Sequence, residues 1–82
     1  MHSPRRTIEA IERLDDMLEI LRDLSLFPGA RKDVTAIRYE VQLLHDAFEF
    51  RFWQIAERRH VRRIKLLESW LYRLDAVYRP LG

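Results

Sequence analysis

Two groups of polar residues in this sequence have spacings that could support metal binding or acid–base chemistry. Glu57 and His60 have the E-x-x-H spacing, which places a carboxylate and an imidazole on one side of a helix, as in di-iron helical bundles. His45 and Glu49 are one helical turn apart, next to Asp46, and could form a general-base pair.

The surroundings of both groups argue against these chemistries. Four arginines lie within three residues of His60, and their positive charge opposes the binding of a divalent cation. No nucleophile and no glycine-rich oxyanion loop accompanies His45. The chain contains no cysteine, so it offers no thiolate nucleophile and no thiolate zinc ligand. We therefore expect no enzyme activity, no metal site and no cofactor.

The densest charge in the sequence is the stretch ERRHVRRIK at residues 57–65, which contains five cations. On a helix, Arg58, Arg62 and Lys65 share one side, and Arg59 and Arg63 lie about 100° around the axis. Such a row could follow a nucleic-acid backbone or pair with acidic groups of another protein. It could equally be neutralised by the acidic segment at residues 9–23 of the same chain.

The stretch AFEFRFWQIA at residues 47–56 is unusually rich in aromatic residues. On a helix, Phe50 and Trp53 project away from the stripe formed by Phe48 and Phe52, so they favour contact with another chain. Tryptophan, phenylalanine and arginine are enriched at protein interfaces. The predicted partner-binding residues are Phe50, Trp53, Arg58, Arg59, Arg62, Arg63 and Lys65.

The elements that must position these residues are predicted to be helices. Ser3 and Pro4 are typical of a helix start, and apolar residues recur at spacings of three and four up to Leu24. Pro28 and Gly29 end this first helix. From residue 33 to 79 there is neither glycine nor proline, and the strand-like alternation FEFRF at 48–52 lies inside a helical pattern. We expect helices at residues 4–26, 32–57 and 61–79.

The last two of these helices could also be continuous. The apolar stripe before residue 57 and the stripe after residue 62 are rotated by about 110° relative to each other. This rotation favours a turn at residues 57–62, whereas the absence of turn-forming residues there disfavours one. The predicted fold class is all-α: a small antiparallel helical bundle, that is, a helical hairpin with a long continuous or broken second helix, which forms a dimer.

The bulk composition places the chain among small globular proteins. Its 82 residues predict a single domain, 1–82, and 48% hydrophobic residues suffice for a core. No stretch is apolar enough for a membrane span, and we expect a cytoplasmic protein. The net charge of +2 is low for a nucleic-acid binder. We expect a non-enzymatic protein-interaction module, such as a small regulator, inhibitor or adaptor; the alternative is a small nucleic-acid-binding protein that uses Arg58–Lys65 on phosphates.

Overall fold

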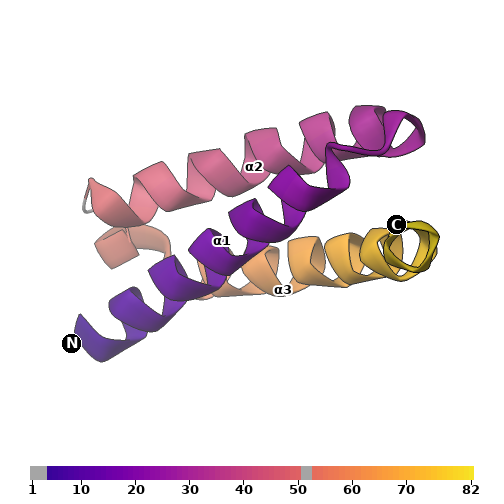
Figure 1. Ribbon diagram of the computed structural model, residues 1–82. Helices are drawn as coiled ribbons and strands as arrows, with labels where there is room; N and C mark the ends of the chain where they lie inside the picture. Colours follow the sequence, from indigo (N-terminus) through magenta and orange to yellow (C-terminus); the bar gives the residue numbers. More distant parts are fainter. Residues whose placement is uncertain (1–3, 51–52) are drawn as a thin grey trace.

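Three α-helices make up the bundle seen in the computed structural model, which describes the backbone of residues 4–50 and 53–82 and the side chains of 5–50 and 58–82. The helices are α1 (Pro4–Leu24), α2 (Arg31–Glu49) and α3 (Trp53–Tyr78), with short 3₁₀ helices at Pro28–Ala30 and Arg79–Leu81. No strand occurs in these ranges. The helices lie side by side in an elongated body, with the two termini at opposite ends (Figure 1). The predicted all-α bundle is confirmed.

The connection between α1 and α2 is fixed by aromatic packing against the end of α3. The Phe27 ring lies 5.7 Å from the Tyr78 ring, centroid to centroid. Gly29 lies directly beneath Tyr78, because a Cβ atom at this position would come within 3.0 Å of the tyrosine oxygen. The sequence Phe-Pro-Gly therefore both ends α1 and lets the connection approach α3 closely.

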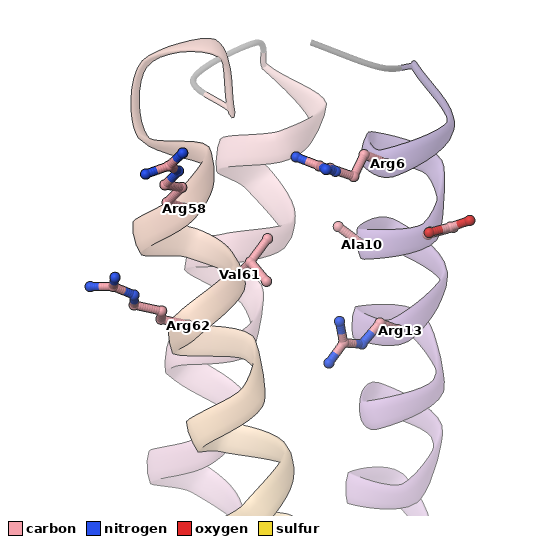
Figure 2. Close-up of a pocket in the computed structure, with 7 residues that line it drawn as sticks. Arg6, Ala10, Arg13, Arg58, Val61 and Arg62 are labelled. Atoms are coloured by element: carbon pink, nitrogen blue, oxygen red, sulfur yellow. The ribbon is translucent and has the colours of Figure 1, made fainter.

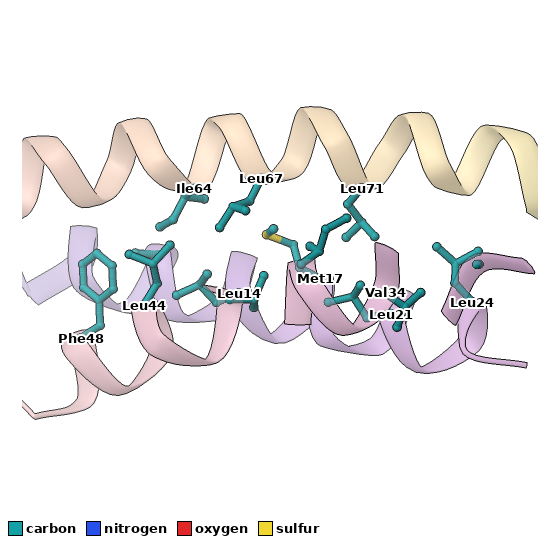
Figure 3. Packing of buried hydrophobic residues seen from close by; sticks show 14 residues of the cluster. Leu14, Met17, Leu21, Leu24, Val34, Leu44, Phe48, Ile64, Leu67 and Leu71 are labelled. Carbon is teal, nitrogen blue, oxygen red and sulfur yellow. The ribbon is translucent and has the colours of Figure 1, made fainter. Parts of the chain in front are cut away.

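The core is a continuous apolar column to which all three helices contribute (Figure 3). It follows the spacing of three and four residues predicted from the sequence, and each fully buried leucine or isoleucine contributes about 1.5–3 kcal/mol to folding. No described polar side chain is buried in it. The fully buried large side chains are Leu14, Met17, Leu21 and Leu24 on α1, Val34 and Val41 on α2, and Ile64, Leu67 and Leu71 on α3.

The sequence left two alternatives open, a turn at residues 57–62 or one continuous helix, and the structure has neither. The helix α2 ends at Glu49, the N–H of Phe50 bonds to the Asp46 carbonyl, and α3 already begins at Trp53. The break therefore falls in the FEFRF stretch, whose aromatic residues have low helix propensity, whereas the arginines of residues 58–63 are good helix formers. The rotation between the two apolar stripes correctly indicated two separate helices, but it placed the break between them at residues 57–62 instead of just after Glu49.

The length and apolar content of the helices determine whether any of them could span a membrane. None of the helices in the described ranges combines the length and the apolar content that spanning a bilayer requires.

Candidate interaction surface

The five cations of residues 57–65 all lie within the first half of α3. Arg58, Arg62 and Lys65 are exposed on this helix, and none of them makes an ion pair with another described residue. A helix that holds three like charges on one side without internal partners leaves them available to an anionic group from outside the chain. We call these three residues the basic row.

The other two predicted arginines face a different way. Arg63 is half-buried and donates from Nη2 to Glu40 Oε1 on α2, and its guanidinium carbon lies 5.6 Å from the centre of the Trp70 ring. Arg59 is exposed and borders a pocket on the same α2 side of α3. Arg62 also borders this pocket, so Arg59 and Arg63 lie further around α3 toward α2, and Arg62 stands between them and the rest of the basic row.

The acidic helix α1 does not neutralise the basic row by any ion pair among the described residues. Its acidic groups pair elsewhere: Asp15 Oδ1 lies 2.9 Å from Nε2 of His45 on α2, and Asp23 lies 4.0 Å from Arg79. The ion pair between the middles of α1 and α3 has the opposite polarity, because here α1 supplies Arg13. The acidic segment at residues 9–23 and the basic row therefore do not form the ion pairs between α1 and α3 that the sequence suggested.

Next to the basic row, a cleft of about 390 Å³ opens between α1 and α3 (Figure 2). The side chains of Ala10 and Val61 point toward each other across it and form an apolar floor. Arg6 and Arg13 extend from α1 toward α3. Arg58 and Arg62 border the cleft from α3, with their guanidinium groups on the side of α3 that faces away from α1. The remaining lining residue is Glu9, which lies 3.8 Å from Arg5.

The charges around this cleft are strongly unbalanced. Arg13 is engaged by the carboxylate of Glu68, and this hydrogen-bonded pair raises the arginine's pKa. Arg58 and Arg62 have no such counter-charge among the described residues. The cleft is therefore an apolar depression with a cationic rim, a combination that can accept an apolar group flanked by carboxylates or phosphates.

His60 lies on the α2 side of α3, away from this cleft. Its ring packs edge-on against Phe48, with 5.3 Å between centroids, and its shielded Nδ1 atom has no hydrogen-bond partner among the described residues. Desolvation, together with the positive charge of Arg59, lowers the pKa of the imidazole. The E-x-x-H spacing with Glu57 cannot be assessed, because the Glu57 side chain lies outside the described residues.

The second polar group, His45, Asp46 and Glu49, does come together in space. Its potential ligand atoms lie within 4.8 Å of one another, and both carboxylates are exposed. His45 Nε2 faces Asp15, and its Nδ1 atom lies 3.7 Å from Glu49. These contacts explain His45 as part of the contact between α1 and α2.

The predicted aromatic contacts are only partly described. Phe50 is 67% exposed just after the end of α2, whereas the Trp53 side chain lies outside the described residues. The sequence reasoning did not identify Ala10, Val61, Arg6 and Arg13 as lining residues, because residues far apart in the sequence meet there only through the packing of α1 on α3.

Comparison of the chain with protein-family models, with curated proteins and with solved structures gave no match in any of the three.

Proposed function

We propose that this chain is a non-enzymatic protein-interaction module that binds an acidic segment of another protein in the cleft between α1 and α3. The observation that carries the proposal is the pairing of an apolar floor, Ala10 and Val61, with Arg58 and Arg62 at its rim, which are exposed and make no ion pair with another described residue. A partner helix or extended segment would place an apolar side chain on the floor and its carboxylates against the guanidinium groups.

The scaffold of this proposal is an antiparallel bundle. The contact between Asp15 and His45 supports opposite directions for α1 and α2. Asp33, near the start of α2, lines one groove together with Val77, near the end of α3, and this supports opposite directions for α2 and α3. The hydrogen bonds from Arg13 to Glu68 hold this arginine in place, so less of its side-chain freedom is lost on binding.

The floor of the cleft favours a protein over a nucleic acid. Phosphate backbones need cations but no apolar anchor, and bases stack on aromatic rings rather than on alanine or valine. Phe50, at the same end of the bundle as the start of α3, adds an exposed apolar side chain that a protein partner can cover.

The alternative function is nucleic-acid binding, which is favoured because the basic row has no ion-pair partner within the described part of the chain. Arg58, Arg62 and Lys65 could contact successive phosphates along one side of α3. In that case, affinity for single-stranded or duplex DNA falls steeply and linearly with the logarithm of salt concentration. An apolar anchor with a few ion pairs gives a much weaker salt dependence.

Selection from a random peptide library tests the protein-binding proposal. We expect the enriched peptides to combine an apolar residue with acidic residues spaced to reach both sides of it, since the floor and the rim require both. Enrichment of apolar peptides without acidic residues, or of no common composition, would overturn the proposal. Binding of labelled DNA at physiological salt, with a steep salt dependence, would establish the alternative.

A further inference from the structure

The groove between α2 and α3 differs in its lining from the other contacts between helices. Between α1 and α2, the described side chains around Leu18 are charged or polar, and the α1–α3 cleft is rimmed by arginines. The α2–α3 groove has a volume of about 410 Å³ and is mainly apolar. Its lining residues are Asp33, Ala36, Ile37 and Glu40 on α2 and Trp70, Arg73, Leu74 and Val77 on α3.

The apolar lining continues beyond this groove onto the exposed face of both helices. Trp70 is 39% exposed and Val77 is 61% exposed. Leu43, two helical turns after Ala36, and Leu66, one turn before Trp70, are also exposed. An apolar face of this length is unusual on the surface of a small monomer and is typical of a surface that another chain covers.

The two walls of the groove carry opposite charges. The α2 wall contributes Asp33 and Glu40, and the α3 wall contributes Arg73. Glu40 already pairs with Arg63 within the chain. Asp33 and Arg73 are exposed, and neither makes an ion pair with a described residue. One face therefore carries both an acidic edge and a basic edge, as a self-complementary interface requires.

The charges select one of two face-to-face arrangements with a two-fold axis. An axis across the helices would lay α3 on the α3 of the second copy and bring Arg59, Arg63 and Arg73 close to the same cations, which is unfavourable. An axis parallel to the helices lays α2 on α3 of the second copy. Asp33 then lies opposite Arg73 of the partner subunit, and small Ala36 lies opposite its large Trp70.

We propose that a second copy of this chain docks on the α2–α3 groove, with α2 of each copy against α3 of the other. The opposite charges of the two walls and the apolar stripe between them favour a second copy of this chain as the partner. The face between these charged edges runs over residues 33–43 of α2 and 66–77 of α3. The cleft between α1 and α3 lies outside this groove, so this inference is independent of the proposed function.

A charge-swap experiment by sedimentation equilibrium tests this arrangement. Asp33→Arg gives a chain with two cations at the contact positions, and Arg73→Asp gives a chain with two anions. We expect the wild type to dimerise and each variant alone to dissociate at concentrations about tenfold higher or more. An equimolar mixture of the two variants should dimerise again, because both contacts in the mixed dimer join opposite charges.

The matched control is Asp16→Arg, the same charge change on an exposed residue of α1, which should leave dimerisation unchanged. Circular dichroism verifies that every variant keeps the helical content of the wild type. A wild type that is monomeric at the highest soluble concentration would overturn the inference. So would single variants that dimerise as well as the wild type, or a mixture that shows no recovery.

Discussion

Arg13 and Glu68 join the middles of α1 and α3 through two hydrogen bonds to the same carboxylate. Arg13 Nε donates to Glu68 Oε2 at 3.1 Å, and Arg13 Nη2 donates to Oε1. The side chains are 37% and 17% exposed, so the pair is partly shielded from water. It lies at the inner end of the arginine-rimmed cleft and fixes how α1 lies on α3 there. The same pair therefore supports both the fold and the proposed binding site.

A double-mutant cycle with Arg13→Met and Glu68→Gln should give a coupling energy of about 1 kcal/mol. The two-fold hydrogen bonding strengthens this pair, and its partial exposure to solvent weakens it. Urea unfolding of the four proteins at one fixed concentration measures the coupling. The exposed pair Arg5 and Glu9, 3.8 Å apart, is the control and should couple more weakly. Equal coupling of the two pairs would contradict the bonding described for Arg13 and Glu68.

Leu21→Ala should destabilise the protein by about 2–5 kcal/mol, because the side chain is fully buried and its removal leaves a cavity. Leu26→Ala is the matched control: this leucine is 78% exposed, and its loss should cost less than about 0.5 kcal/mol. Thermal unfolding distinguishes the two. Similar melting temperatures for both variants would show that α1 does not pack as described.

Tyr78→Ala should lower stability by about 1–3 kcal/mol, since it removes the ring contact with Phe27 and uncovers Gly29. Tyr39, which is 67% exposed on α2, supplies the control substitution Tyr39→Ala. Hydrogen exchange is the more local measurement: we expect faster exchange of the amides from Phe27 to Ala30 in the Tyr78 variant alone. Unchanged exchange there would argue against docking of this connection on α3.

Acidification should destabilise the protein in part through His60. Its pKa is lowered in the folded state, first by desolvation and then by Arg59, so the unfolded chain takes up the proton more readily. Stability is then lost as the pH falls through the usual histidine value of 6.5 toward the lower folded value.

Melting temperatures at about pH 7.5 and about pH 5.5 measure this effect. The decrease should be larger in the wild type than in His60→Gln, which carries no titrating group at this position. His45 with Asp15 and Glu49, and the paired carboxylates of Glu40 and Glu68, are present in both proteins and cancel in the comparison. Equal decreases would show that His60 titrates as it does in the unfolded chain.

Local sequence patterns were sufficient to predict the helices and the core, but not the position of every joint. The stripes through Leu14, Leu21 and Leu71 follow from helical periodicity, and Pro28 and Gly29 are strong chain-breaking residues. The break after Glu49 has no such residue, and the low helix propensity of the aromatic residues there is a much weaker signal. Differences in propensity of this size are too small to place a helix end to within a few residues.

The candidate site was predicted only where it lies on one helix. Arg58, Arg62 and Lys65 share a side of α3 by spacing alone, so their common orientation was predictable. Their neighbours Ala10 and Val61 carry no chemical signal, and they become a floor only when α1 packs on α3. The pairing of Arg63 with Glu40 likewise depends on the register between α2 and α3, which the sequence leaves open.

The most direct test of the proposed function is the affinity of a library-selected acidic peptide for two charge-matched variants. Arg58→Glu with Arg62→Glu reverses the rim of the cleft, whereas Arg31→Glu with Lys32→Glu makes the same charge change on exposed residues at the start of α2. Fluorescence anisotropy at physiological salt should show that the first variant loses at least about tenfold in affinity and the second about twofold or less. Equal losses in the two variants would contradict binding at the arginine-rimmed cleft.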